Sequence, residues 1–554
     1  MRHRIVHAAG RPMQISVSEV LVRFMERLGI RHIFGMPGAH ILPVYDALHS
    51  SPIQTVLAKH EQGAAFMAGG YARATGAIGA CITTAGPGAT NLVTGIANAH
   101  ADRLPVLAVT GETSTAIFGR GGLQESSGEG GTIDQVALFD GITRYARLVE
   151  RTDYLGTVLN RAAHVLTSNR PGPVLLSFPF DVQTEPVDAA VLEQVAFGRR
   201  RPNRPGPDEV EVAVQLLQTA RRPVILAGYG CLAAGAGAKV ARLSRRLGAP
   251  VTTSLKAKGL VDENEPLALG TLGVTSGDHA YRYIRERADL LLILGAGFNE
   301  RTSYLWDAQL LEGRRIVQVD RDPDQLEKVF RADLAVVSDV GLFLDALLER
   351  LEPKNAADDA PPRRGRSALF PEGFELVECF FRLLERRFDE PLLLFDDNII
   401  FAQNFLRARP EFHYFPNSGI SSLGHALPAA VGARFALDRP TFALLGDGGF
   451  QMCAMELMTA VNYRIPLTVV VFNNGTMGLI RKNQAQQYGG RFIDCDFVNP
   501  DYAKLAEAFG MAHRRAETVD ALEAAFESLD MRSGLNLLEI VIDRDAFPAY
   551  SSRR

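Results

Sequence analysis

The sequence Gly446-Asp-Gly-Gly-Phe450 lies between two short apolar runs, Thr441-Phe-Ala-Leu-Leu445 and Ile465-Pro-Leu-Thr-Val-Val-Val-Phe472. Each run has the length and composition of a strand that is buried on both faces of a parallel sheet. Between the runs, apolar residues recur at helical spacing: Met455, Leu457, Met458 and Val461. The stretch therefore predicts a strand, a glycine turn, a helix and a second strand, which is the repeating unit of an α/β fold.

Polar residues follow both predicted strands. Asp447 comes directly after the first, and Asn473-Asn474 ends the second. Glycine after a strand lets the backbone approach a phosphate, and the next helix N-terminus offers free N–H donors. A carboxylate and an amide at neighbouring strand ends suit a hard cation that also takes phosphate oxygens as ligands. A glycine-rich turn without a ligand is the alternative that the residues alone leave open.

The length of 554 residues exceeds what one hydrophobic core supports and predicts about three domains. Alternation of strand and helix patterns continues through the chain, so each domain is expected to be a doubly wound parallel sheet. Breaks at residues 198–206 and 353–368 are rich in glycine, proline and charge and indicate linkers. The predicted parts are an N-terminal extension and three domains: 1–12, 13–190, 207–352 and 369–554.

The composition describes a globular protein whose partners are small molecules or other subunits. A formal net charge of −4 and 22% charged residues give no bias toward nucleic acid or membrane. The five cysteines are scattered without the spacing of a zinc site or a disulfide framework, which favours a reducing cytoplasm. The N-terminus lacks an apolar run of signal-peptide length.

Glu61 follows a predicted strand, Thr55-Val-Leu57, and precedes a helix of small residues. A carboxyl group that is buried there holds a proton more strongly and could exchange it near neutral pH. An acid in the first turn of a helix also complements the helix dipole, and that structural role stays open on the residues alone.

The sequence resembles one enzyme family nearly end to end, from about residue 14 to 545. The Gly-Asp-Gly and Asn-Asn motifs resemble the thiamine diphosphate signature. Four further segments are similar to the acetolactate (acetohydroxyacid) synthase large subunit family: residues 33–38, 59–64, 70–76 and 86–97. The resemblance implies three α/β domains that bind, in order, the pyrimidine, optionally a nucleotide, and the diphosphate with its metal.

The resemblance also implies roles for residues. Mg²⁺ is expected to be held by Asp447, Asn474 and the carbonyl of Thr476. Glu61 is expected to activate the aminopyrimidine ring of thiamine diphosphate. Leu423 is expected to wedge the cofactor into a bent shape, with the Ser421 carbonyl accepting from its amine. The remaining expected cofactor contacts are Gly446, Gly448, Gly449 and Met477.

The implied reaction is decarboxylation of a 2-oxo acid, pyruvate by family analogy, followed by transfer of the acyl unit to a second acceptor. The alternative is a non-oxidative 2-oxo acid decarboxylase or a C–C lyase. In this family Glu61 and the metal site serve one cofactor across a subunit interface. A homodimer or homotetramer is therefore expected.

The sequence departs from the synthases around the acceptor. Their tryptophan after Asn-Asn is Asn483 here, and the phenylalanine before the retained Gln124 is Leu123. Gln124 is expected to be catalytic, within a glycine-rich and therefore mobile loop at residues 121–132. Together these changes indicate a different acceptor.

Three further side chains carry alternatives. His40 stands in a turn similar to that of benzaldehyde lyase, which implies a proton-relay role, whereas a partly exposed polar histidine is the other interpretation. Arg481 and Lys482 could bind a substrate carboxylate or form a solvated helix face.

The middle domain resembles the FAD-binding domain of the synthases at residues 270–277, 295–301 and 319–323. Asn299-Glu300 replaces the usual acidic pair, so whether FAD binds stays open. Asp320, at a predicted strand end, could face a ribose or solvent.

Overall fold

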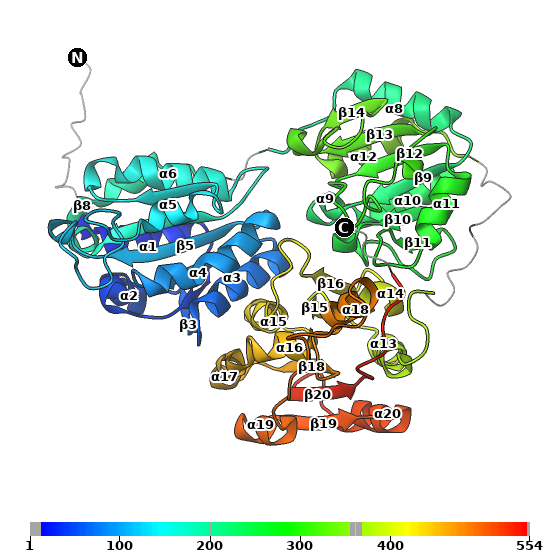
Figure 1. The fold of residues 1–554 in the computed structure, drawn as a ribbon. Helices are drawn as coiled ribbons and strands as arrows, with labels where there is room; N and C mark the ends of the chain where they lie inside the picture. The colour runs from blue at the N-terminus through cyan, green and yellow to red at the C-terminus, as the bar shows by residue number, and fades with distance from the viewer. Residues whose placement is uncertain (1–12, 199–200, 355–360, 362–367, 551–554) are drawn as a thin grey trace, which may run out of the picture. The chain divides into compact units, whose positions relative to one another are not determined.

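The structure is a computed structural model that describes residues 13–198, 201–354, 361 and 368–550. The chain forms two compact units, residues 1–200 and residues 201–554, and each is described by itself. The first unit contains one six-stranded parallel sheet and the second contains two (Figure 1). The predicted class, doubly wound parallel sheets flanked by helices, is confirmed.

The sheet of the first unit has the strand order β3-β2-β4-β5-β7-β6. Its strands are β2 (His32–Gly35), β3 (Gln54–Leu57), β4 (Gly79–Thr83), β5 (Val106–Glu112), β6 (Tyr145–Leu148) and β7 (Val174–Pro179). Its helices are α1 (Val17–Arg27), α2 (Leu42–His49), α3 (Glu61–Thr75), α4 (Pro87–Ala101), α5 (Gln135–Asp140), α6 (Leu155–Leu166) and α7 (Phe180–Thr184). An antiparallel pair, β1 (Gln14–Ser16) with β8 (Pro186–Asp188), joins the two ends of the unit.

Local sequence signals explain these boundaries. Ser16 and Glu19 form a reciprocal capping box at the start of α1, and Gly29 adopts a left-handed φ of 78° just after its end. Every residue of β4, β5 and β7 is buried, as is usual for inner strands of a parallel sheet that helices cover on both faces.

The first sheet of the second unit has the order β11-β10-β9-β12-β13-β14. Its strands are β9 (Pro223–Ala227), β10 (Val251–Thr253), β11 (Ala268–Thr271), β12 (Leu290–Leu294), β13 (Arg315–Asp320) and β14 (Leu334–Val337). Its helices are α8 (Pro207–Thr219), α9 (Tyr229–Ala233), α10 (Gly237–Leu247), α11 (His279–Arg287) and α12 (Val340–Arg350).

The second sheet of this unit has the order β16-β15-β17-β18-β20-β19. Its strands are β15 (Leu392–Asp396), β16 (Phe412–Pro416), β17 (Thr441–Gly446), β18 (Leu467–Asn473), β19 (Ala512–Ala516) and β20 (Leu535–Val541). Its helices are α13 (Glu375–Arg387), α14 (Phe401–Phe405), α15 (Ala426–Arg434), α16 (Asp447–Gln451), α17 (Leu457–Asn462), α18 (Gly478–Gln487), α19 (Tyr502–Ala508) and α20 (Val519–Ser528).

Near the middle of each sheet lies a point at which the strand order changes direction. These points lie between β2 and β4, between β9 and β12, and between β15 and β17. In open α/β sheets, ligands bind beyond the carboxyl ends of the strands at such a point. Topology alone therefore predicts three places where a ligand could bind.

Some expectations differ from the structure. The single helix expected after Gly449 is interrupted: α16 ends at Gln451, a 3₁₀ turn covers Ala454–Glu456, and α17 follows. Met455, assigned to its apolar face, is 61% exposed, because the interruption turns it away from the core. The extension at residues 1–12 and most of the linker at 353–368 lie outside the described residues. The domain boundaries stay a prediction.

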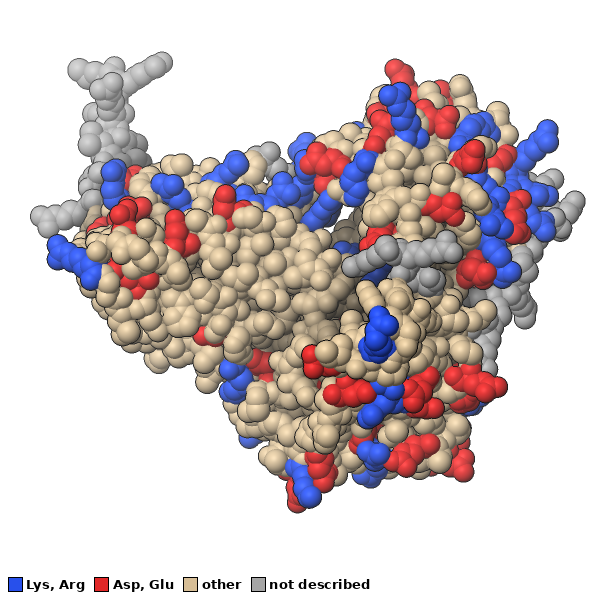
Figure 2. All heavy atoms as spheres, viewed as in Figure 1, with Lys and Arg blue, Asp and Glu red and all other residues tan. Residues whose placement is uncertain are grey.

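The surface agrees with the charge balance of the sequence. On the visible face, basic and acidic side chains are interspersed over both units (Figure 2). Within the described residues, no helix combines the length and apolar character that a membrane span requires.

Candidate functional site

Asp447 lies at the start of α16, beyond the end of β17 and beside the end of β18. It is 1% exposed, and four N–H groups surround its carboxylate. Oδ2 accepts from the backbone N of Asn474 (3.1 Å) and Gly475 (2.6 Å) and from Nδ2 of Asn499 (2.8 Å). Oδ1 accepts from its neighbour Gly448 (3.0 Å). Burial raises the pKa of Asp447, while these hydrogen bonds lower it.

The two asparagines at the end of β18 have different surroundings. Asn473 is committed to the protein, because Nδ2 donates to Glu539 (2.6 Å) and Oδ1 accepts from Asn499 (2.8 Å). The Asn474 side chain makes no hydrogen bond within the described part of the chain, so its oxygen is available to a ligand. Asn474 was the predicted metal ligand, and the structure gives it the freedom that this role needs.

The glycines of the turn are required by close contacts. A Cβ at Gly448 would lie 2.5 Å from Sδ of Met477, and one at Gly449 would lie 2.5 Å from Oδ2 of Asp397. Gly446 ends β17 and precedes the first turn of α16. The turn therefore brings Asp447 and Met477 close together, as two of the predicted cofactor contacts would need.

Asp397 holds a second loop beside this turn. It follows β15, is 0% exposed, and accepts from the backbone N of Gly424 (2.7 Å), His425 (2.9 Å) and Ala426 (3.2 Å). The loop that it fixes contains Ser421, which has a left-handed φ of 57°, and Leu423, which is half-buried. Leu423 is thus not an ordinary core residue, and the apolar side chain stays partly open to a ligand.

The oxygen groups near Asp447 suit Mg²⁺. The predicted set combines one carboxylate, one amide oxygen and the carbonyl of Thr476, which is 2% exposed and anchored through its hydroxyl to the Cys495 carbonyl (2.8 Å). No cluster of three or more His, Cys, Asp or Glu side chains with metal-binding geometry occurs in the described chain. A hard cation bound by one carboxylate and neutral oxygens fits both observations.

In the first unit, predicted residues meet at the point between β2 and β4. His40 Nδ1 lies 3.2 Å from Gln124 Oε1, and the Thr84 hydroxyl donates to the same oxygen (3.4 Å). Because an amide oxygen only accepts, the contact puts the proton of His40 on Nδ1 and leaves Nε2 as an acceptor. His40 is half-buried, so both interpretations, the proton relay and the partly exposed polar histidine, stay open.

Glu61 is the first residue of α3, where it is half-buried. Its Oε2 accepts from Nδ2 of Asn91 in α4 (2.9 Å). The preceding His60 caps the helix by accepting from the backbone N of Gln62 (3.1 Å). Glu61 thus occupies the first-turn position that the dipole interpretation required, and Asn91 fixes its direction.

The glycine-rich loop at residues 121–132 is anchored more firmly than its composition indicated. Glu125 accepts from the backbone N of Gly119 (2.5 Å) and Gly122 (2.8 Å) and from the Ser127 hydroxyl (2.9 Å). Leu123, at the position of the family phenylalanine, is 77% exposed. The expectation of a mobile loop overlooked these acid-to-backbone bonds, which sequence spacing does not reveal.

Arg481 and Lys482 do not form a solvated helix face. Both are buried in α18. Arg481 pairs with Asp496 (2.7 Å) and Asp545 (2.8 Å) and stacks on Phe492, so its guanidinium is already occupied by carboxylates. This corrects both alternatives for Arg481.

Lys482 is 0% exposed, and its Nζ lies 3.7 Å from the centre of the Tyr550 ring and 3.3 Å from Oδ1 of Asn483. Burial lowers the pKa of Lys482. Asn483, predicted to replace an aromatic wall, therefore has its amide oxygen turned toward this buried amine.

The point between β9 and β12 is lined by glycine. A Cβ at Gly228 would lie 2.1 Å from the carbonyl oxygen of Gly295, and one at Gly230 would lie 2.7 Å from Gly295 Cα. Asp320, at the end of β13, is 7% exposed, so its solvent-facing alternative is wrong. These glycines let the segments after β9 and β12 pack backbone against backbone.

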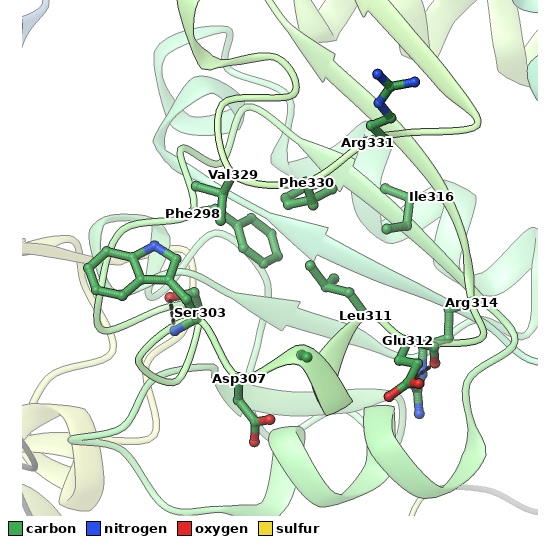
Figure 3. Close-up of a pocket in the computed structure, with 12 residues that line it drawn as sticks. Phe298, Ser303, Asp307, Leu311, Glu312, Arg314, Ile316, Val329, Phe330 and Arg331 are labelled. Atoms are coloured by element: carbon green, nitrogen blue, oxygen red, sulfur yellow. Dashed lines mark hydrogen bonds between the residues drawn. The ribbon is translucent and has the colours of Figure 1, made fainter.

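A separate pocket of about 530 Å³ lies in the same unit. It lies beside the start of β13, and its apolar lining includes Phe298, Leu311, Ile316, Val329 and Phe330 (Figure 3). Gly228, Gly230 and Gly295 are not among the residues that line this pocket.

Two residues of the candidate site were missed by sequence reasoning. Asn499 lies in a segment without regular structure, and no sequence signal marks its contact with Asp447. Asp397 follows an apolar strand, as Asp447 does, so the rule that found Asp447 would also have found it.

Three family models match the chain. Their descriptions are thiamine pyrophosphate enzyme N-terminal TPP binding domain (residues 15–138), central domain (210–347) and C-terminal TPP binding domain (398–540). Thiamine pyrophosphate is the compound also called thiamine diphosphate. The C-terminal match spans Asp447 and Asn474, and the N-terminal match spans Glu61, His40 and Gln124.

Similar curated proteins cover nearly the whole chain. The acetolactate synthase of Arthrospira platensis is 32% identical, over 95% of this chain and 94% of its own. The acetolactate synthase isozyme 2 large subunit of Escherichia coli K12 is 32% identical, over 94% and 95%. The acetolactate synthase large subunit of Corynebacterium glutamicum is 31% identical, over 97% and 88%.

Proposed function

The chain belongs to the thiamine pyrophosphate enzyme family, and from that premise we propose that it decarboxylates a 2-oxo acid and transfers the acyl unit to a second acceptor. Pyruvate is the proposed donor, because the relatives with end-to-end similarity are named acetolactate synthases. The single observation that supports this most is Asp447, a buried carboxylate beside a free Asn474 amide at the end of β18.

Mg²⁺ is proposed to bind Asp447, the Asn474 side chain and the Thr476 carbonyl. When bound, thiamine diphosphate supplies the electron-accepting ring that makes loss of carbon dioxide from a 2-oxo acid feasible. The protein supplies orientation and proton handling. Gly446, Gly448, Gly449 and Met477 would face the diphosphate end, and Ser421 with Leu423 the bent middle of the cofactor.

Glu61 is proposed to hold a proton at the aminopyrimidine ring. Support comes from its place at the start of α3 and from Asn91, which fixes one carboxylate oxygen (2.9 Å) and leaves the other for the ring. His40 and Gln124 are proposed to act on the acceptor. Nε2 of His40 would take or give the proton at the acceptor carbonyl, while Gln124 and Thr84 keep the imidazole in one tautomer.

The alternative function is a non-oxidative 2-oxo acid decarboxylase or a C–C lyase. The oriented His40 ring is compatible with it as well, since a group that exchanges a proton at the reacting carbonyl also serves release of a free aldehyde. The products separate the two functions. Incubation with pyruvate should yield a ligated product; free acetaldehyde as the main product would support the alternative.

The native acceptor is proposed to be polar or anionic rather than 2-oxobutyrate. Asn483 replaces an apolar wall by an amide, and the buried Lys482 lies next to it. Competition between pyruvate and 2-oxobutyrate as acceptors tests this. A strong preference for 2-oxobutyrate that survives in Asn483→Trp would contradict it.

FAD is proposed to bind at the point between β9 and β12, where Gly228, Gly230 and Gly295 lie, with Asp320 near the ribose. Protein that is colourless after purification and unchanged by added FAD would remove the flavin. The proposed assembly is a homodimer or homotetramer with active sites at subunit interfaces, and the proposed compartment is the cytoplasm, supported by five free and buried thiols.

The central test is metal and cofactor dependence. Dialysis against a chelator should abolish carbon dioxide release from pyruvate. Addition of both Mg²⁺ and thiamine diphosphate should restore it, whereas addition of either one alone should not. Asp447→Ala should lose cofactor binding. Wild-type cofactor affinity in that variant would overturn the assignment.

A further inference from the structure

Glu112, the last residue of β5, is a fully buried carboxyl without an assigned role. It is 0% exposed. Its Oε1 accepts three hydrogen bonds, from the backbone N of Thr113 (2.8 Å), the Thr113 hydroxyl (3.3 Å) and the backbone N of Ser126 (3.0 Å). Its Oε2 is buried and has no partner within the described residues. An acid so placed costs free energy, which calls for a compensating function.

The bond to Ser126 connects β5 with the turn that carries Gln124. The Ser126 hydroxyl accepts from the backbone N of Gly86 (3.0 Å) and donates to the carbonyl of Gln124 (3.0 Å). Ser126 is therefore clamped at both its backbone and its side chain. Loss of Glu112 would leave the buried N–H of Ser126 without an acceptor.

Gln124 needs such a clamp because its backbone is strained. Its φ of 59° lies in the left-handed region, which glutamine adopts only when its surroundings impose it. Packing adds to the constraint, since a Cβ at Gly86 would lie 3.0 Å from Cβ of Gln124. In this conformation the Gln124 amide reaches His40 Nδ1 (3.2 Å).

The backbone of His40 is fixed from the same strand. A Cβ at Gly111 would lie 2.2 Å from the carbonyl oxygen of His40, and Nε2 of Gln183 donates to that oxygen (2.7 Å). Gly111 and Glu112 are consecutive residues of β5. One strand end thus sets the backbone of His40 directly and that of Gln124 through Ser126.

We propose that Glu112 is a positioning residue that, through Ser126, holds Gln124 in its left-handed turn and against the ring of His40. The proposal rests on the proposed function of the His40 and Gln124 pair in acceptor chemistry. Glu112 does not touch substrate or cofactor in this role. It keeps the two groups at hydrogen-bonding distance, and so sets the share of acyl units that reach an acceptor.

The surroundings of Glu112 favour its neutral form. Burial raises the pKa of Glu112 most, against the hydrogen bonds from Ser126 and Thr113, and the nearby carboxylate of Glu125 raises it further. A neutral acid accepts from an N–H through its carbonyl oxygen as an amide does. Glutamine should therefore replace Glu112 with little loss, whereas alanine should not.

The test compares Glu112→Ala and Glu112→Gln in the full-length holoenzyme. The first readout is hydrogen exchange at the Ser126 amide, followed by mass spectrometry of peptides that cover residues 121–127. Alanine should accelerate this exchange about tenfold or more, because the amide loses its acceptor, and glutamine should restore protection.

The second readout is the ratio of ligated product to free aldehyde formed from pyruvate. Glu112→Ala and Gln124→Ala should each lower it about tenfold, the effect expected for one lost buried hydrogen bond. The double variant should be no lower than Gln124→Ala, since both act through one contact. Glu112→Gln should match the wild type.

Asp181→Ala is the matched control. Asp181 also bonds the same connecting segment, at the Thr115 backbone N (3.0 Å), but has no contact with Ser126 or Gln124. It should leave the Ser126 exchange and the product ratio unchanged.

Unchanged Ser126 exchange in Glu112→Ala would overturn the proposal, as would additive losses in the double variant. Absence of any ligated product from the wild type would instead contradict the proposed function. Hydrogen exchange at the Ser126 amide would still test whether Glu112 holds the turn, because that measurement does not depend on the reaction.

Discussion

At the scale of single residues, Asp447, the proposed metal ligand, is held by side chains outside the proposed set of ligands. Asn499 donates from one Nδ2 to both Asp447 Oδ2 and Asn473 Oδ1, while its own oxygen accepts from Gln451 (2.8 Å) and Tyr502 (2.9 Å). It thus connects the end of β17 with the end of β18. Groups that orient metal ligands in this way affect metal affinity strongly.

We expect Asn499→Ala to weaken Mg²⁺ binding in the presence of thiamine diphosphate by about 10- to 100-fold. The reason is that Asp447 and Asn473 lose a shared donor and can each rotate. Magnesium titration of activity or of cofactor fluorescence quenching measures this. The exposed Asn462→Ala, at the end of α17, is the control and should bind as the wild type does. Equal affinities in both variants would contradict the connecting role.

Asp397 provides a pH-dependent prediction. Burial raises the pKa of Asp397 to about 6, from an ordinary value of 3.8. Because the folded protein prefers the protonated form, stability from this group is greatest below pH about 4. About 3 kcal/mol is lost as the pH rises from about 4 to about 6. Asp397→Asn does not titrate, so the melting temperature of the wild type relative to this variant should be higher at pH 5 than at pH 7.5.

Asp501→Asn is the control for that comparison. Asp501 caps α19 at the surface, and backbone hydrogen bonds from Lys504 lower its pKa. Its contribution is complete above its ordinary pKa and is lost only in stronger acid. The difference in melting temperature between the wild type and Asp501→Asn should therefore be the same at pH 5 and pH 7.5. A constant difference for Asp397→Asn as well would show that Asp397 does not titrate in this range.

Residues at strand ends could be predicted from sequence, but residues that hold them could not. Asp447 and Asn474 follow apolar runs at family spacing, so pattern and resemblance both find them. Glu112 also ends an apolar run, yet its proposed positioning role depends on the hydrogen bond to Ser126, which lies near it only because of the fold. Arg481 was misjudged for the same reason, since Asp545 is 64 residues away in the chain.

At the scale of elements, α3 and α4 form the tightest helix pair of the first unit. A Cβ at Gly95 of α4 would lie 2.3 Å from Cβ of Ala65 and 3.2 Å from the carbonyl oxygen of Gln62, both in α3. The small residues of both helices permit this approach. The short distance is also what allows Asn91 of α4 to reach Glu61 of α3.

Gly95→Ala should therefore separate the two helices and stretch the Asn91–Glu61 bond. Overpacking of this kind costs about 1–3 kcal/mol. We expect a lower melting temperature together with weaker thiamine diphosphate binding, measured by thermal denaturation with and without cofactor. Gly69→Ala is the matched control within α3, because its Cβ would meet only Leu104 Cδ1 at 3.8 Å. That variant should be neutral or slightly more stable, since alanine favours helix.

The sequence predicted the strands better than the helices after β17. Fully buried strands give continuous apolar runs, which β4, β5, β12 and β15 all show. The helix expected from Met455 onward relied on spacing alone. The 3₁₀ turn at Ala454–Glu456 breaks that spacing and leaves Met455 exposed, so the apolar pattern there does not describe a core-facing stripe.

At the scale of the whole molecule, the first and third of the six-stranded parallel sheets share one relative strand order, while the sheet that contains β9 has another. In all three sheets the candidate residues lie at or beyond the carboxyl ends of strands. Because the carboxyl ends of parallel strands meet at one edge of a sheet, residues far apart in the sequence come together there. The five cysteines lie within these cores, one in the first unit and four in the second, and all are buried.

The cysteines should therefore report unfolding of the two units separately. Burial raises the pKa of Cys81 and of Cys231 to about 12, so neither is a reactive thiolate in the folded state. Native protein should react with a thiol reagent far more slowly than protein in guanidinium, where all five thiols titrate. In Cys81→Ser, the part of the thiol reaction that reports unfolding of the first unit should vanish. Fast reaction of any thiol without denaturant would contradict the described burial.

The four N–H groups around Asp447 also affect how the protein retains its proposed metal. Asp447 is the one charged group that the protein offers the proposed cation, and four N–H groups already bond to it, so at least half of the charge of Mg²⁺ must be balanced by the diphosphate. Cation and vitamin cofactor then reinforce each other's retention by equal factors, as reciprocity of binding requires. A cell short of thiamine would therefore need more magnesium to keep this protein loaded with metal.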